Sequence, residues 1–224
     1  MPVADKNLLI FDCDGVLVDS EPISIQILVE AVRQAGVDLD EAGAYRRFLG
    51  RSLSTVTDAL KDEYGLTVGT DFLEGMRHAL YERFRRELKP IEGIAEALDR
   101  IDMRRCVASS SQLERIRLSL SVTGLLERLE PNIFSASMVK RGKPAPDLFL
   151  HAARAMHAQP DQCIVIEDSP AGIEAAKAAG MTVFAFTGGS HAAGPSHVER
   201  IEALAPDRVF DAMADLIQLV QNKE

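Results

Sequence analysis

The sequence is poor in cationic side chains and has no long apolar run. Of its 224 residues, 25 are Lys or Arg and 34 are Asp or Glu, which gives a formal net charge of −9. A general nucleic-acid-binding protein needs a basic face to neutralise phosphates, so this balance argues against a nucleic-acid partner. No apolar stretch approaches the length that crosses a bilayer, and residues 1–7 are polar. We therefore expect no signal peptide and no membrane association.

Cysteine is also scarce in this chain. The three cysteines are Cys13, Cys106 and Cys163, and each lies in or beside an apolar run. An odd number of thiols without paired spacing predicts no disulfide framework and favours a reducing, cytoplasmic location. The sequence has no CxxC pair and no Cys/His cluster that would indicate a zinc site.

A sizeable core is nevertheless available, because 46% of the residues are hydrophobic and 26% are charged, as in globular proteins. Apolar runs of strand length lie at 8–11, 106–108, 133–134, 163–166, 183–186 and 208–210. Several are nearly continuous, as expected for parallel strands that are covered on both faces. Helical patterns lie between them at 91–101, 113–120, 147–156 and 171–179. This alternation predicts an α/β fold with a Rossmann-like, doubly wound parallel sheet.

One stretch interrupts this alternation. Between the first two expected strands there are only helical patterns, at 23–35, 53–64 and 72–88. Gly36 and Gly65 supply stop signals for two of these helices. We therefore expect a core domain made of residues 1–18 and 90–224, with an inserted α-helical domain at 19–89.

Polar and acidic residues directly follow three of the expected strands. The first strand ends in Asp12-Cys13-Asp14-Gly15, the second in Ser109-Ser110-Ser111, and a later one in Glu167-Asp168. In an open α/β sheet the ligand site lies beyond the carboxyl ends of the strands, so these side chains should meet there. Residues two apart in an extended chain point the same way, so Asp12 and Asp14 can face one pocket.

Such a concentration of carboxylates is costly unless a cation offsets the repulsion. A few oxygen ligands completed by water fit Mg²⁺ better than zinc or a calcium cage. The Ser109 hydroxyl with the amides after it, and the charge of Lys143 on a proline-stiffened loop, suit a bound phosphate. Each feature alone has an ordinary explanation, since turns use aspartate freely and the first turn of a helix favours acids such as Asp168. Their occurrence together, in this order, predicts a phosphate-processing site.

Four motifs carry this pattern along the chain. They are residues 11–21 around Asp12-Cys13-Asp14-Gly15, then Ser109, then residues 142–147 beginning Gly142-Lys143-Pro144, and residues 166–172 with Glu167-Asp168. Together they resemble the motifs of the haloacid dehalogenase-like hydrolase superfamily. The resemblance covers essentially the whole chain. It is closest to the phosphatase and β-phosphoglucomutase-like branch, which carries a helical cap where the insertion lies here.

The resemblance implies a chemical role for each acidic residue. Asp12 would attack phosphorus and form an aspartyl-phosphate, while Asp14 would protonate the leaving oxygen and then activate water. Mg²⁺ would be held by the Asp12 carboxylate, the Asp14 backbone carbonyl and Asp168. Glu167 would support this metal site.

The same resemblance implies that Ser109 and Lys143 bind the phosphoryl oxygens, and that the cap closes over the site. The candidates for substrate contact are Glu21, Gly50, Arg51, Ser110, Ser111 and Gln112. Arg51 would add a cation for an anionic part of the substrate, although an exposed loop arginine explains it equally well. The expected partner is a small phosphorylated metabolite of the sugar phosphate or phosphogluconate type. The expected assembly is a monomer or a weak homo-oligomer.

Other functions fit the sequence less well. Mutases of the branch carry a histidine at the position of Ser24, so its absence favours hydrolysis. Dehalogenases of the superfamily work without magnesium and lack the second acidic residue, so Asp14 argues against that reaction. A non-catalytic binding module has no use for an aspartate pair poised against phosphate. We therefore predict a Mg²⁺-dependent phosphatase, a phosphoric monoester hydrolase, with a phosphosugar mutase as the alternative.

Overall fold

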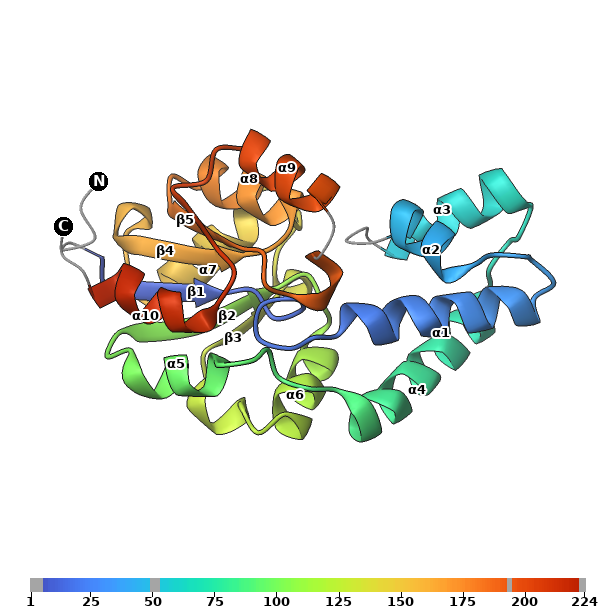
Figure 1. Cartoon of the computed structure of the whole chain (residues 1–224), viewed down its shortest axis with the longest axis horizontal. Helices are drawn as coiled ribbons and strands as arrows, with labels where there is room; N and C mark the ends of the chain where they lie inside the picture. The colour runs from blue at the N-terminus through green and yellow to red at the C-terminus, as the bar shows by residue number, and fades with distance from the viewer. Residues whose placement is uncertain (1–5, 49–52, 193–194, 222–224) are drawn as a thin grey trace. The chain divides into compact units, whose positions relative to one another are not determined.

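The computed structural model describes residues 6–48, 53–192 and 195–221. The chain divides into two compact units, one formed by Met1–Asp19 and Lys89–Glu224 and the other by Ser20–Leu88. We call these the core unit and the helical unit (Figure 1). Among the described residues, no helix has both the length and the apolar composition needed to cross a membrane.

Six parallel strands form the sheet of the core unit. They are β1 (Leu8–Phe11), β2 (Arg104–Ser109), β3 (Ile133–Ser135), β4 (Cys163–Glu167), β5 (Thr182–Phe186) and β6 (Arg208–Phe210). Their order is β3-β2-β1-β4-β5-β6, so the chain builds one half of the sheet from β1 and then returns to build the other. This order is doubly wound, and the direction of winding reverses beside β1. The predicted α/β fold is confirmed, and each expected strand segment lies within one of these strands.

Helices cover both faces of this sheet, which explains the continuous apolar runs. They are α5 (Ile94–Arg100), α6 (Leu113–Val122), α7 (Asp147–Ala155), α8 (Pro170–Ala178), α9 (Pro195–Ala203) and α10 (Met213–Gln221). Leu8 and Ile10 point to one face and share a buried cluster with α7, α8 and α9. Leu9 and Phe11 point to the other face and are equally buried. Figure 1 shows α5 and α10, which pack together, on the opposite side of the sheet from α8 and α9.

Local sequence signals fix the start of α8 directly behind the acidic end of β4. The Ser169 hydroxyl accepts a hydrogen bond from the backbone N of Gly172 at 3.1 Å, and Pro170 occupies the first turn. Gly180 takes the positive φ that follows the helix, 73°. Serine at the N-cap, proline in the first turn and glycine after the last turn are the residue types that favour these positions. Because the helix begins at Pro170, the two acidic residues before it are held at the edge of the sheet.

The helical unit contains α1 (Glu21–Gln34), α2 (Glu41–Phe48), α3 (Leu53–Tyr64) and α4 (Thr70–Glu87). It has its own buried cluster, in which Val29 and Val32 of α1 are joined by Phe48 and Leu60. The three expected helices agree with α1, α3 and α4. The helix α2, which is only eight residues long, was not among the expected helices.

Candidate active site

Three strand ends meet at the middle of the sheet, where β1 lies between β2 and β4. The backbone N of Asp12 donates to the carbonyl oxygen of Ile166 at 3.0 Å, which extends the pairing of β1 with β4 by one residue. Asp12, Ser109, Glu167 and Asp168 therefore emerge at the carboxyl edge, and all four are buried. Buried polar side chains need partners, so their contacts define what the site can do.

Gly15 allows the loop after Asp12 to pass close to Asp168. Its φ is 81°, a left-handed conformation that glycine adopts without strain. A Cβ at this position would lie 2.1 Å from Oδ2 of Asp168. Any other residue at position 15 would push the loop and the carboxylate apart.

Lys143 lies between two buried carboxylates. Its Nζ is 2.6 Å from Oδ1 of Asp12 and 2.7 Å from Oε1 of Glu167, and its side chain is 4% exposed. The Phe149 ring lies against it, with its centroid 4.8 Å from Nζ. Burial acts to lower the pKa of Lys143, but the charges of Asp12 and Glu167 outweigh burial and raise the pKa. Lys143 is therefore a fixed cation beside Asp12.

Glu167 links this lysine to the loop after β4. Its second oxygen, Oε2, accepts hydrogen bonds from the backbone N atoms of Asp168 and Ser169, both at 2.8 Å. The Ser169 hydroxyl donates to the same oxygen at 2.9 Å. Both carboxylate oxygens of Glu167 thus have donors within the protein, so this residue fixes the direction of Lys143 and the course of the loop.

Negative charge exceeds positive charge around Asp12. Burial raises the pKa of Asp12 well above its ordinary value, Lys143 acts to lower it, and Glu167 and Asp168 raise it further. Burial also raises the pKa of Asp168, while His191 acts in the opposite direction. An added cation at this edge would be stabilised by the unbalanced carboxylates. Within the described ranges, however, no three His, Cys, Asp or Glu side chains converge into a ready-made metal cage.

Asp14 is held by a donor from the loop before α6 and by another from the first turn of this helix. The Ser111 hydroxyl donates to Oδ2 of Asp14 at 2.6 Å, and Nη2 of Arg115 lies 2.8 Å from Oδ1. The backbone N of Ser111 in turn donates to the Ser109 hydroxyl oxygen at 3.1 Å. Ser111 therefore connects Asp14, which follows β1, to Ser109 at the end of β2. Both are predicted catalytic residues.

The remaining predicted contacts are less closely tied to this group. Ser110 and Gln112 are exposed in the core unit, on the loop that leads into α6. Glu21 is half-buried at the first position of α1 in the helical unit. Gly50 and Arg51 lie outside the described residues. The substrate contacts of all five residues stay predictions.

Sequence reasoning missed three residues at this edge: Arg115, His191 and His197. Arg115 lies four residues after Ser111, in the first turn of α6, so this spacing was a usable signal. His191 has its Nε2 2.7 Å from Oδ2 of Asp168, although 23 residues separate the two in the chain. Only the return of the chain after β5 brings them together, and no local spacing indicates it.

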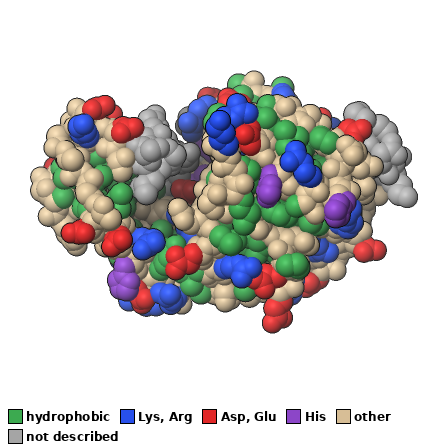
Figure 2. Space-filling view, turned by 180° about the vertical axis from the view of Figure 1, so that it is seen from behind, with side chains coloured by type: hydrophobic (Ala, Val, Ile, Leu, Met, Phe, Trp, Pro, Cys, Tyr) green, Lys and Arg blue, Asp and Glu red, His purple; other side chains and the backbone are tan. Residues whose placement is uncertain are grey.

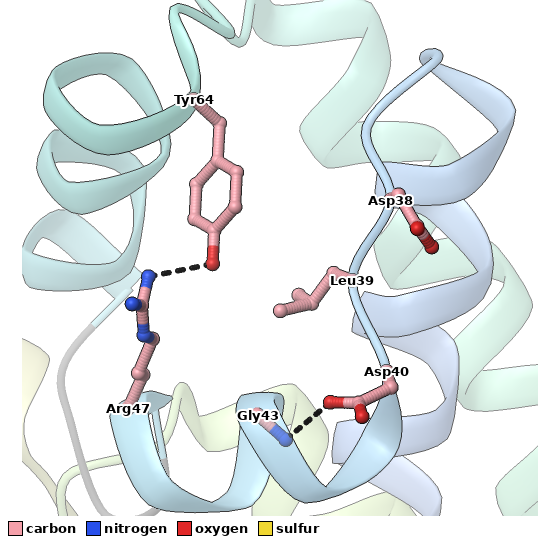
Figure 3. Close-up of a pocket in the computed structure, with 6 residues that line it drawn as sticks. All are labelled: Asp38, Leu39, Asp40, Gly43, Arg47 and Tyr64. Atoms are coloured by element: carbon pink, nitrogen blue, oxygen red, sulfur yellow. Dashed lines mark hydrogen bonds between the residues drawn. The ribbon is translucent and has the colours of Figure 1, made fainter.

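A separate pocket lies within the helical unit (Figure 3). Its lining residues are Asp38, Leu39, Asp40, Gly43, Arg47 and Tyr64. Nη1 of Arg47 donates to the Tyr64 hydroxyl at 2.6 Å, and Oδ1 of Asp40 accepts from the backbone N of Gly43 at 2.6 Å. None of the predicted site residues lines this pocket, so we assign the chemistry to the strand ends of the core unit instead.

Comparison with known proteins agrees with this arrangement of strand ends. A family model described as haloacid dehalogenase-like hydrolase matches residues 9–186. The chain therefore belongs to the haloacid dehalogenase-like hydrolase family. The match begins in β1 and ends with β5, so it includes every residue of the site described above except those that follow Phe186.

Several relatives resemble the chain over most of its length. The 6-phosphogluconate phosphatase of Escherichia coli is 35% identical over 182 residues, which cover 81% of this chain and 82% of that protein. A haloacid dehalogenase-like protein of unknown function from Agrobacterium tumefaciens has a TM-score of 0.85 and 36% identity, covering 96% and 98% of the two chains. A hydrolase of the same family from Deinococcus radiodurans, solved with bound phosphate and sodium, has a TM-score of 0.78 and 32% identity, covering 97% and 96%.

The unbalanced charge predicts that Asp12 destabilises the folded protein when no cation is present. A carboxyl whose pKa is raised by folding keeps its proton in the folded state at a pH where the unfolded chain has lost it, so stability falls as the pH rises above about 4. Replacing the carboxylate in Asp12→Asn should therefore raise the free energy of unfolding by about 0.5–2 kcal/mol near pH 8 in chelator. The gain should be smaller near about pH 5, because the difference in proton uptake between the folded and the unfolded chain narrows toward the ordinary aspartate pKa of about 4.

Urea unfolding of both proteins at the two pH values measures this effect. Glu174→Gln removes an exposed carboxylate from α8 and serves as the matched control, for which we expect no comparable gain. If Asp12→Asn were less stable than the wild type near the higher pH, Lys143 would need both carboxylates to remain stably buried. The proposed excess of negative charge around Asp12 would then be disproved.

Proposed function

We propose that the protein is a Mg²⁺-dependent phosphatase that hydrolyses a small phosphorylated metabolite, of the sugar phosphate or phosphogluconate type, through an aspartyl-phosphate at Asp12. The observation that carries this proposal is the buried lysine, 2.6 Å from the Asp12 carboxylate at the winding reversal of the sheet. A fixed cation beside a carboxylate allows that carboxylate to approach an anionic phosphate. The phosphatases among the relatives support the same reaction class.

Asp12 is the proposed nucleophile. Lys143 binds its Oδ1, and we assign the attack to Oδ2. A bond forms between this oxygen and phosphorus while the bond from phosphorus to the alcohol oxygen breaks. In the second step water attacks phosphorus, the bond to Asp12 breaks, and inorganic phosphate leaves. The covalent intermediate thus divides one difficult displacement into two.

Asp14 is the proposed acid and base of the two steps. In the first step it gives a proton to the leaving alcohol oxygen, and in the second it takes a proton from the attacking water. Its two oxygens face Ser111 and Arg115 in this structure, so its direction depends on the start of α6. The Ser109 hydroxyl accepts from Ser111 and can donate its own hydrogen to a phosphoryl oxygen.

The site fits a magnesium ion in its charge and its donors. Phosphatases of this superfamily generally use Mg²⁺, and Asp12, Asp168 and the backbone carbonyl of Asp14 are the residues that would hold it. Mg²⁺ commonly uses one or two carboxylates and completes its shell with water and substrate phosphate, so a full protein cage is not needed. When bound, it would neutralise charge on the transferring phosphoryl group. The raised pKa of Asp12 and of Asp168 is the observation that supports a cation here.

Substrate recognition is assigned by analogy. The Escherichia coli relative is named for 6-phosphogluconate, and others are named for phosphorylated carbohydrates and fructose 1-phosphate. We propose that Ser110 and Gln112 of the core unit, together with Glu21, Gly50 and Arg51, contact the leaving group. A cap function for the helical unit and a monomeric or weakly associated state belong to the same proposal.

Surface charge and thiols support the remaining parts of the proposal. On the face drawn in Figure 2, the described cationic and anionic side chains are interspersed, without a broad basic area for nucleic acid. The described cysteines, Cys13, Cys106 and Cys163, are buried and unpaired, which supports a reducing cytoplasm as the location.

A phosphosugar mutase is the weaker alternative. Ser24 stands where mutases of the branch carry histidine, and its hydroxyl donates to the Ser20 carbonyl oxygen at 2.9 Å within α1. A side chain engaged in this way is a poor substitute for a histidine that must reach a sugar hydroxyl. Two solved structures, each assigned only provisionally as a β-phosphoglucomutase, match at 22% and 26% identity, which supports the shared fold.

The first test is release of inorganic phosphate from a panel of sugar phosphates and phosphorylated sugar acids. We expect release with Mg²⁺, none with chelator, and a loss of at least about 1000-fold in Asp12→Asn because the nucleophile is gone. Isomerisation of a hexose 1-phosphate in the presence of a bisphosphate, without phosphate release, would transfer the assignment to the mutase. Activity that survives in Asp12→Asn would contradict the mechanism.

A second test concerns the proposed proton donor. The variant Arg115→Gln removes the cation that holds Asp14. It should slow the hydrolysis of an alkyl phosphate, such as a sugar phosphate, by about 10-fold or more, because the leaving alkoxide must receive a proton from Asp14. An activated aryl phosphate, whose phenolate leaves without a proton, should be slowed much less.

Comparison of kcat for the two substrates measures this difference. Arg117→Gln is the matched control, because Arg117 lies on the same helix and pairs with Glu130 at 3.3 Å instead. An equal loss on both substrates would mean that Arg115 only supports the fold, and a change confined to KM would assign it to substrate binding.

A further inference from the structure

Two histidines from the segment after β5 hold Asp168 from two directions. Nε2 of His191 lies 2.7 Å from Oδ2 of the Asp168 side chain, and the His191 side chain is 3% exposed. Nε2 of His197 donates to the backbone carbonyl oxygen of the same residue at 2.9 Å. The two rings meet edge to face, with their centroids 5.3 Å apart. One histidine therefore contacts the carboxylate while the other holds the main chain that carries it.

The surrounding loops are shaped to admit the His191 ring. A Cβ at Gly189 would lie 2.7 Å from Cε1 of His191, and a Cβ at Gly15 would lie 2.8 Å from the same atom. Real side chains do not approach so closely, so both glycines leave space that the imidazole fills. The Ser190 hydroxyl also donates to Oδ1 of Asp19 at 2.6 Å, which ties this segment to the loop after β1.

We propose that His191 and His197 are positioning residues that orient Asp168 for a divalent cation and thereby set the affinity of the site for it. This inference rests on the proposed function, because it takes Asp168 as a metal ligand. His191 engages Oδ2, so Oδ1 is the oxygen that would be left to hold a cation. Partners that fix a coordinating side chain typically contribute about 10–100-fold to metal affinity. A site with only two carboxylate ligands depends strongly on the direction of each.

The test is calorimetric titration of Mg²⁺ into the metal-free protein at one fixed pH, without substrate. We expect His191→Leu to weaken binding by about 10–100-fold. His191→Gln keeps an N–H donor close to the position of Nε2 and should retain most of the affinity. Gly189→Ala leaves the imidazole in the sequence but displaces its ring, so it should weaken binding as well.

His151→Leu is the matched control, because His151 is a core-unit histidine that packs edge to face on Phe134. We expect its Mg²⁺ affinity to equal that of the wild type. Thermal unfolding in chelator identifies any variant that has lost its fold. If His191→Leu does not fold, the comparison of Gly189→Ala with His191→Gln carries the test.

Unchanged or tighter Mg²⁺ binding in folded His191→Leu and Gly189→Ala would overturn the inference, since His191 would then be neutral or a competitor for Asp168. That result would leave the proposed phosphatase function intact. Absence of Mg²⁺ binding to the wild type would instead remove the proposed metal and this inference together. The two failures are therefore distinguishable.

Discussion

The ion pair of Lys143 with Asp12 and Glu167 is the interaction on which the site depends. A lysine that is 4% exposed must be paired, and it is paired with one carboxylate from the end of β1 and another from the end of β4. Removing both carboxylates from such a buried lysine would leave a costly charge behind, whereas either carboxylate alone can still pair with it. The same contact that stabilises the lysine fixes the carboxylate proposed to attack phosphorus. Structure and chemistry therefore share one constraint, which is set by the parallel order of the strands.

That constraint leaves the edge of the sheet with excess negative charge. Burial is the main cause of the raised pKa of Asp12, and the single cation Lys143 does not offset the added charges of Glu167 and Asp168. The protein around them responds with oriented donors: backbone amides on Glu167 and His191 on Asp168. Such an arrangement is expected where a site is built for a cation and an anionic substrate together. It trades folded-state stability for function.

The sequence predicted the parts of the site that follow from strand ends. Asp12 directly follows one apolar run and Glu167-Asp168 follow another, so their meeting required only that the sheet be parallel and doubly wound. The spacing of Arg115 from Ser111 was a usable signal that was missed, whereas His191 reaches Asp168 only through the return of the chain after β5. The short helix α2 was missed because a weak apolar pattern over eight residues is a poor signal. Substrate specificity stays a matter of analogy, since Arg51 and its neighbours lie outside the described residues.

The central claim is that phosphate passes through a covalent bond to Asp12. The most direct measurement is rapid acid quenching of the enzyme during turnover of a substrate with a radiolabelled phosphate, followed by proteolysis and identification of the labelled peptide. The account predicts label on the peptide that contains Asp12 in the wild type, and no protein-bound label in Asp12→Asn. Turnover without any protein-bound label, or label on a different residue, would contradict it.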